Sequence, residues 1–182
     1  MSVSTTLYRF RIDVSDIDRG FYEKLDFRLA MHPSEAMPYL LTRVLAFCLN
    51  SQEGLEFSRA GLSDPEGPSI SANHANGRIS LWIEIGNPSA RKLHKAAKAS
   101  AQVKIYTYKD PEHILREAQS KEIHNREKIE IYSFPVKFLE KLGEDLPRDV
   151  RWQLLHNDNL LTISSGEKSE QCEIKRFKMT QN

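Results

Sequence analysis

The chain has 182 residues, 40% of them apolar, which is enough to fold one domain around a substantial core. Its 26 basic and 25 acidic residues leave a net charge of +1, which excludes proteins that hold nucleic acid by overall charge alone. Any site for a polyanion must therefore be local. No stretch approaches the ~20 apolar residues of a membrane-spanning helix, so we expect no membrane association.

The N-terminal sequence and the cysteines indicate a cytoplasmic protein. The start of the chain lacks the apolar central region of a secretory signal. Cys48 and Cys172 lie far apart in the sequence, and we expect both to be free thiols in a reducing compartment. Cysteine and histidine do not occur at the spacing of a zinc site. Without internal repeats or a linker, residues 1–182 are predicted to form a single domain.

The first predicted elements are two long strands. Residues 5–14 and 21–31 alternate between apolar and polar side chains, which is the period of a half-buried strand. Turn-forming residues lie between them, so an N-terminal β-hairpin is expected. A buried helix follows, with Ser34 as its expected N-cap. Glu35 would then lie near the positive helix end, where a carboxylate complements the helix dipole.

A strand–helix–strand unit is predicted in the middle of the chain. Strands at residues 55–62 and 69–72 precede it, separated by a turn-rich link. An apolar strand at residues 79–85 then leads through a Gly-Asn-Pro-Ser turn into a basic helix, which Ser89 can cap. The helix returns to a strand at residues 103–108. Such a crossover favours parallel neighbouring strands.

Glu84 lies at the carboxyl end of this central strand, next to the basic helix. Alternation places Trp82 and Ser80 on the same strand face as Glu84. An acid at a strand end beside a basic helix suits a metal ion and a phosphate group. The alternatives are a plain ion pair between Glu84 and a helix lysine, and a solvated basic helix face. The basic residues of the helix are Arg91, Lys92, His94, Lys95 and Lys98.

The last third of the chain predicts short helices and further strands. The final strands are joined by tight turns and are expected to form a mostly antiparallel addition. The pattern as a whole predicts an α/β fold with a mixed sheet. Helices are predicted at residues 112–119 and 135–142, and strands at residues 128–134, 150–156, 160–164 and 171–177.

Three short stretches give the chain a family resemblance. The sequences HPSE at residues 32–35, RVLAF at residues 43–47 and LWIEIGNPSARKLHKA at residues 81–96 resemble the YaeQ family. The resemblance covers nearly the whole chain. The fold of that family is similar to the PD-(D/E)XK, or restriction-endonuclease-like, fold. The resemblance therefore implies a central mixed β-sheet flanked by helices, with an N-terminal hairpin and C-terminal antiparallel strands.

The resemblance also implies a Mg²⁺-dependent site that hydrolyses the phosphodiester bonds of nucleic acid. In such a site carboxylates bind the metal, which prefers hard oxygen ligands, and a lysine acts on the attacking water. The implied metal ligands are Glu35, Glu66 and Glu84. Glu84 would also be catalytic, together with Lys95 as the preferred lysine or Lys92 as its alternative. The implied substrate-binding residues are Arg91, Lys98, Gln102 and Ser80, and we expect Arg91, Lys95, Lys98 and Gln102 to form one stripe on the helix.

Two departures from the nuclease pattern favour a different function. The expected lysine, two residues after Glu84, is replaced by Gly86, which cannot act as a base. Relatives carry an acid where this chain has Ser80, a weaker metal contact. The alternative is a catalytically degenerate binding or regulatory module on the same scaffold. The spacing of Gln102 and Tyr106 matches a short nuclease-like motif, but a capping amide and a core aromatic explain it equally well.

Overall fold

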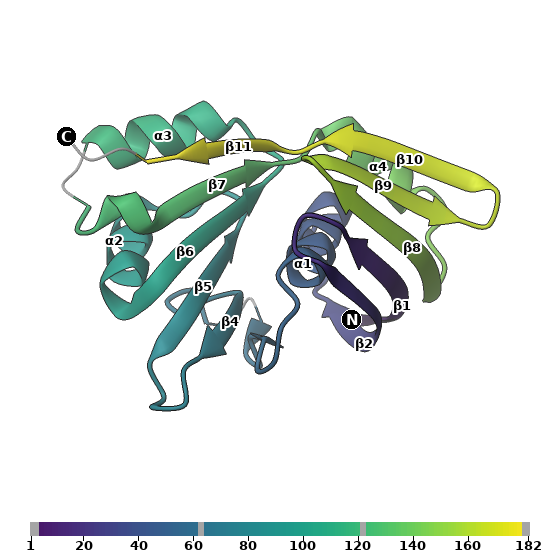
Figure 1. Ribbon diagram of the computed structural model, residues 1–182, viewed down its shortest axis with the longest axis horizontal. Helices are drawn as coiled ribbons and strands as arrows, with labels where there is room; N and C mark the ends of the chain where they lie inside the picture. The colour runs from purple at the N-terminus through teal and green to yellow at the C-terminus, as the bar shows by residue number, and fades with distance from the viewer. Residues whose placement is uncertain (1–3, 62–63, 121–122, 180–182) are drawn as a thin grey trace. The chain divides into compact units, whose positions relative to one another are not determined.

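A computed structural model describes residues 4–61, 64–120 and 123–179, and Figure 1 shows its helices and strands. Within these residues the α-helices are α1 (Met37–Leu49), α2 (Ala90–Ala99), α3 (Pro111–Ser120) and α4 (Val136–Gly143), with a 3₁₀ helix, η2, at Arg126–Lys128. The strands are β1 (Thr6–Asp16), β2 (Phe21–Met31), β3 (Glu56–Phe57), β4 (Ile70–Asn73), β5 (Ile79–Ile85), β6 (Ser100–Thr107), β7 (Ile129–Ser133), β8 (Asp149–Asn157), β9 (Leu160–Ser165), β10 (Lys168–Glu173) and β11 (Lys175–Lys178). In the described residues, no helix is both long and apolar enough to cross a membrane.

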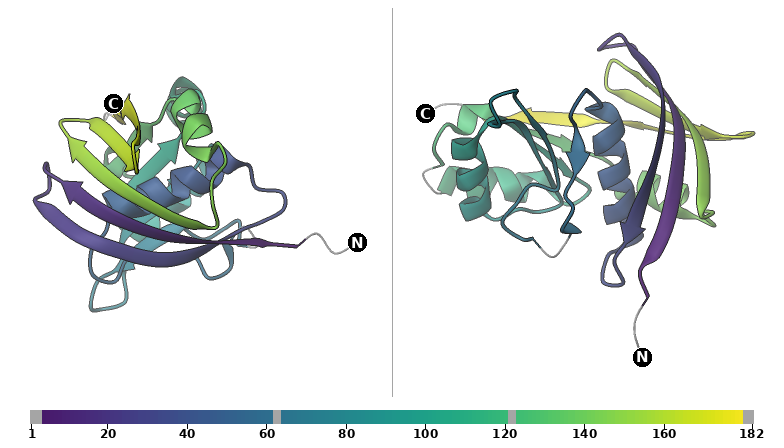
Figure 2. Two further views of the ribbon diagram at one scale, coloured as in Figure 1. Left: turned by 90° about the vertical axis from the view of Figure 1, so that its right-hand side faces the viewer. Right: turned by 90° about the horizontal axis from the view of Figure 1, so that it is seen from below.

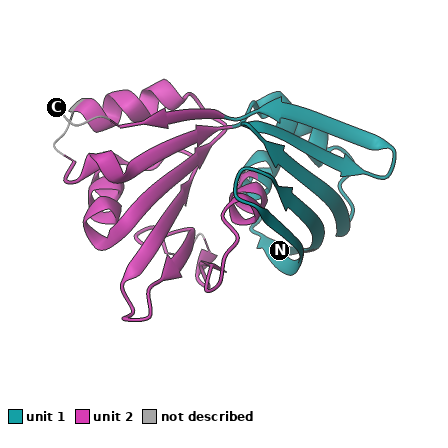
Figure 3. Ribbon diagram, in the orientation of Figure 1, with its two compact units in different colours: residues 1–41, 134–174 teal, residues 42–133, 175–182 magenta. Residues whose placement is uncertain are grey.

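The chain divides into two compact units, which Figure 3 shows in different colours. The first comprises residues 1–41 and 134–174, and the second comprises residues 42–133 and 175–182. One boundary falls inside α1 and another falls between β10 and β11. The prediction of a single domain over the whole chain stays a prediction.

The first unit contains a five-stranded sheet in the order β10-β9-β8-β1-β2. The predicted N-terminal hairpin is confirmed: β1 and β2 pair antiparallel from Thr6 opposite Met31 to Asp16 opposite Phe21. Figure 2 shows these two long strands side by side. Alternate residues of β1 are buried, among them Phe10, because one face of the sheet covers the core. The predicted antiparallel strands are present as β8, β9 and β10, and β8 pairs parallel with β1.

The second unit contains a six-stranded sheet in the order β11-β7-β6-β5-β4-β3. The predicted crossover is confirmed, because β5, α2 and β6 form a strand–helix–strand unit with parallel strands. β7 extends the parallel part of the sheet. Helices α2 and α3 pack on one face, where Leu93 and Ile114 join Trp82 and Ile105 in a buried cluster. This face fixes α2 next to the carboxyl end of β5.

The predicted mixed α/β fold is confirmed, but the expected single central sheet is wrong. The described strands form two sheets. The strand predicted at residues 171–177 is broken at Ile174, whose N–H donates to the carbonyl of Asn159. Its first part is β10, which pairs with β9, and its second part is β11, which pairs with β7. The strand predicted at residues 55–62 is short: β3 covers Glu56–Phe57, and Leu62 lies outside the described residues.

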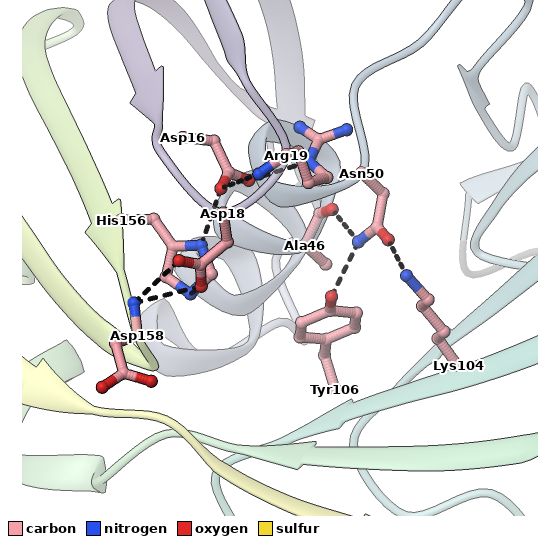
Figure 4. A network of polar contacts seen from close by, with 9 residues as sticks. All are labelled: Asp16, Asp18, Arg19, Ala46, Asn50, Lys104, Tyr106, His156 and Asp158. Atoms are coloured by element: carbon pink, nitrogen blue, oxygen red, sulfur yellow. Dashed lines mark hydrogen bonds and ion pairs between the residues drawn. The ribbon is translucent and has the colours of Figure 1, made fainter.

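A polar cluster holds together the turns at one end of the first sheet (Figure 4). Asp16 is 1% exposed, and its carboxylate accepts from Nε of Arg19 at 2.8 Å and contacts Nδ1 of His156 at 3.0 Å. Asp18 accepts from the backbone N–H of Asp158 at 2.9 Å. Burial raises the pKa of Asp16, but the hydrogen bonds from Arg19 and His156 outweigh burial and lower the pKa below its ordinary value. The ionised carboxylate therefore stabilises this end of the sheet.

We expect the variant Asp16→Asn to lower the free energy of unfolding at pH 7 by about 1–3 kcal/mol, because Arg19 and His156 lose a buried charged partner. The stabilisation by Asp16 is present above the pKa of an unfolded Asp, near 4, and is lost as the pH falls through the lowered folded pKa. The difference between wild type and variant should therefore shrink on acidification. Urea unfolding between pH 7 and pH 3 measures it.

Asp13→Asn is the matched control, because Asp13 is exposed on the same strand. It should change the unfolding free energy little at any pH. Equal losses in the two variants, or a loss for Asp16→Asn that is constant with pH, would contradict the assignment.

Candidate functional site

The centre of the candidate site is the carboxylate of Glu84, near the end of β5. Glu84 is 2% exposed. Its Oε1 accepts a hydrogen bond from Nε1 of Trp82 at 2.7 Å, which agrees with the prediction that the two side chains share a strand face. A buried charge of this kind requires partners, because leaving it unpaired in the core would be very costly.

The second partner of Glu84 comes from the first turn of α2. Ser89 is the N-cap, as predicted, and its side chain accepts from the backbone N–H of Lys92 at 3.2 Å. Nζ of Lys92 lies 3.0 Å from Oε2 of Glu84, and the Lys92 side chain is 18% exposed. It is therefore Lys92, rather than the preferred Lys95, that reaches the strand acid.

Both oxygens of Glu84 are thus occupied by donors. Burial raises the pKa of Glu84 above its ordinary value, and the attraction of Lys92 and the hydrogen bonds from Trp82 and Lys92 offset part of this rise. The arrangement is a buried ion pair whose carboxylate also accepts from the indole N–H. A new ligand of the carboxylate would compete with Lys92 and Trp82 for its oxygens.

Glu66 makes a second, more open contact with α2. Asp64 shapes the turn, because its Oδ1 accepts from the backbone N–H groups of Glu66 and Gly67, each at 3.1 Å. The Glu66 side chain is 54% exposed, and its Oε2 lies 3.4 Å from Nζ of Lys95 and 3.9 Å from Nη2 of Arg91. Glu84 and Glu66 therefore each face a basic side chain of α2.

Gly86 follows β5 at the position where the nuclease pattern has a lysine. Its φ is +85°, a left-handed conformation that favours glycine. Its N–H donates to the carbonyl of Tyr106 at 2.8 Å. The glycine thus ends the strand with a bend of the backbone, in addition to removing a side chain.

Two predicted substrate-binding residues have other local roles. The hydroxyl of Ser80 donates to the carbonyl of Ala72 at 3.0 Å, within the sheet. Helix α2 ends at Ala99, so Gln102 lies on β6 opposite Leu81, and the prediction of a helical stripe that includes Gln102 is wrong. The spacing of these residues predicted a helix that continues past Ser100. Instead, the Ser100 hydroxyl donates to the carbonyl of Ala96, and the helix ends at Ala99.

Glu35 belongs to the first unit, whereas Glu66, Glu84 and the lysines of α2 belong to the second. Glu35 is 7% exposed, and its Oε2 accepts from the backbone N–H of His32 at 3.0 Å. The prediction that Ser34 caps the helix is wrong, because α1 begins at Met37 and the Ser34 hydroxyl contacts Nδ1 of His32 at 2.7 Å. Glu35 therefore lies before the first turn of α1.

In the described parts of the chain, no group of three or more His, Cys, Asp or Glu side chains could hold a metal ion. Mg²⁺ is usually bound by one or two carboxylates together with water. Glu66 is open enough for this role, but both oxygens of Glu84 already accept from nitrogen donors. Magnesium binding stays a prediction.

A polar network on β6 was not predicted from the sequence (Figure 4). The side-chain amide of Asn50 donates to the Tyr106 hydroxyl at 2.8 Å, and Nζ of Lys104 donates to Asn50 Oδ1 at 2.7 Å. The Tyr106 ring stacks on Tyr132 at 4.8 Å. Burial and a hydrogen bond to Glu130 raise the pKa of Tyr132, so this residue is a neutral phenol. The alternation that places Lys104 and Tyr106 on one face of the strand was the feature of the sequence from which this network could have been predicted.

Comparisons with known proteins agree on one family. The model of the family "YaeQ protein" matches residues 1–175. "Uncharacterized protein YaeQ" from Escherichia coli K12 is 35% identical over 108 residues, and the Salmonella typhi protein of that name is 33% identical over the same length. These matches cover 59% of this chain, which thus spans about three fifths of the length of these curated relatives.

Two solved structures cover more of the chain. The crystal structure of the YaeQ protein from Xanthomonas axonopodis pv. citri matches with a TM-score of 0.87 and 26% identity, over 97% of this chain and 100% of that chain. The YaeQ protein from Pseudomonas syringae matches with a TM-score of 0.82 and 27% identity, over 98% and 97% of the two chains. Sequence and structure together lead to one conclusion: this chain belongs to the YaeQ protein family.

Proposed function

We propose that this chain is a nucleic-acid-binding module on a nuclease-like scaffold that does not itself cut phosphodiester bonds. The observation that carries the proposal is the buried pair between Glu84 and Lys92, in which both carboxylate oxygens have donors. A metal ligand must be reachable by the ion and its water, whereas Glu84 is 2% exposed and has a nitrogen donor at each oxygen. The resemblance of residues 81–96 to a nuclease-like core supplies the scaffold, and fold alone does not supply activity.

Helix α2 provides the surface for the nucleic acid. It contains five basic side chains and no acid. Arg91 is 87% exposed and Lys95 is 49% exposed, so both can reach a ligand from solvent. Their contacts with Glu66 are exposed ion pairs, which stabilise by only about 0–1 kcal/mol. A phosphate group can therefore compete with Glu66 for these two cations.

A second candidate function is Mg²⁺-dependent hydrolysis of nucleic acid. The observation that favours it is the position of Lys92, whose Nζ lies 3.0 Å from Glu84 and could replace the lysine missing at Gly86. When bound, magnesium would polarise a phosphate and lower the pKa of an attacking water. In this function Glu84 and Glu66 would be the metal ligands, and Lys92 or Lys95 would orient the water.

One experiment separates the two functions. We expect calorimetry to detect no Mg²⁺ binding and a mixed panel of DNA and RNA substrates to remain uncut. The variant Glu84→Gln should remain folded but lose about 1–3 kcal/mol of stability, because the largely buried Lys92 ammonium loses its charged partner while the amide still accepts from Trp82. Thermal unfolding measures this stability.

The matched control is Glu53→Gln, an exposed acid of the same unit. Mg²⁺-dependent cleavage that survives in Glu53→Gln and disappears in Glu84→Gln would reject the non-catalytic function and establish the second candidate.

A second prediction tests the binding surface. The double variant Arg91→Gln/Lys95→Gln should bind duplex DNA about 3–10-fold more weakly. It should also reduce the slope of log affinity against log salt concentration by about 2, at about 0.9 for each lost phosphate contact. Fluorescence anisotropy at several salt concentrations measures both quantities.

The variant Arg59→Gln/Lys109→Gln is the control, because it removes the same charge from exposed positions of the same unit. If both double variants lose the same affinity and slope, α2 is not the surface. If wild-type protein shows no salt-dependent binding, the chain is not a nucleic-acid binder, and a partner pull-down becomes the next measurement.

A further inference from the structure

A cavity of about 390 Å³ lies in the second unit, at the opposite end of β5 from Glu84. Its walls come from the turn between β4 and β5, the end of α2, the start of β6 and the end of η2. Four of its lining residues are His74, Arg78, Lys98 and Lys128. Among the described residues that line it, none is an aspartate or glutamate. In a chain with a net charge of +1, this is a local concentration of positive charge.

The turn that carries His74 and Arg78 is well defined by hydrogen bonds. The N–H of His74 donates to the carbonyl of Arg78 at 2.7 Å, and the N–H of Gly77 donates back to the carbonyl of His74 at 2.9 Å. Oδ1 of Asn76 accepts from the N–H of Arg78 at 3.0 Å. This bonding fixes the backbone from which the two basic side chains project, so little backbone conformational entropy is lost when a ligand binds.

The end of α2 would by itself repel an anion, because the last carbonyls of a helix carry partial negative charge. Lys128 offsets this effect. Its Nζ donates to the carbonyl of Ser100 at 3.2 Å and to that of Ala97 at 3.4 Å. Arg78 and Lys98 are exposed, and neither forms an ion pair with the described part of the chain. Their charge is therefore available to a ligand.

We propose that this cavity binds a phosphate group of a phosphorylated ligand, with Arg78 and Lys98 as its principal contacts. An arginine beside a lysine offers a forked donor and a point charge, which is a pairing suited to phosphate oxygens. The volume lies within the range of about 300–1,000 Å³ that is typical of small-ligand sites, so more than the phosphate group itself can enter. The site uses neither Glu84 nor the Arg91 and Lys95 surface, and it goes beyond the proposed function.

The test follows backbone amide resonances of isotope-labelled full-length protein during titration with inorganic phosphate at constant ionic strength. We expect saturable shifts at residues 74–78 and 98–101. The variant Arg78→Gln/Lys98→Gln should raise the dissociation constant at least about tenfold, because both charge-assisted contacts are lost. Arg59→Gln/Lys109→Gln, with the same loss of charge elsewhere in the unit, should leave it unchanged.

Two oligonucleotides that differ only in a 5′-phosphate identify the source of the phosphate group. Stronger binding of the phosphorylated one, lost in Arg78→Gln/Lys98→Gln, assigns the site to a terminal phosphate. Equal binding that this variant weakens assigns it to backbone phosphates, and shifts with inorganic phosphate alone assign it to a small free ligand. Each result supports the proposal even if Arg91→Gln/Lys95→Gln has no effect on nucleic-acid binding. Wild-type protein without saturable shifts at these residues, or equal weakening in the two double variants, would overturn it.

Discussion

The carboxylate of Glu84 is buried between an indole N–H and a lysine, and the neighbouring chain is organised around this charge. A carboxylate that is 2% exposed is tolerated when its oxygens have partners, and here both do. Trp82 comes from the same strand, whereas Lys92 must be delivered by α2. The N-cap at Ser89, the first turn of the helix and the packing of Leu93 on the sheet all place this one ammonium group.

Because Lys92 pairs with Glu84, the basic residues of α2 fall into groups with different environments. Lys92 is largely buried and has an internal partner, whereas Arg91 and Lys95 are open and share the exposed Glu66. Further along the helix, Lys98 lines a cavity whose described lining contains no acid. One short helix thus combines a structural cation with two sets of cations that a ligand can reach. This division gives a chain of nearly neutral net charge a local concentration of exposed positive charge.

Local signals in the sequence predicted local structure well. The alternation in β1, β2 and β5, the Ser89 cap and the parallel crossover were all readable, because each depends on neighbouring residues. The division into two sheets could not be predicted in this way, because strand pairing depends on contacts between residues that lie far apart in the chain. The break at Ile174, whose N–H donates to the carbonyl of Asn159, is an example. The sequence also could not decide whether Lys92 or Lys95 contacts Glu84. The two residues lie one turn apart on nearly the same helix side, and only their height relative to the strand end separates them.

Gly86 limits which side chains the end of β5 tolerates. Its φ of +85° and its hydrogen bond to Tyr106 belong to a backbone that lysine adopts only with strain, at a cost of about 1–2 kcal/mol. A substitution of Gly86 by lysine would therefore lower stability, while Lys92 still paired with the carboxylate of Glu84. A lysine side chain at this position thus requires a second change that relaxes the backbone of the turn.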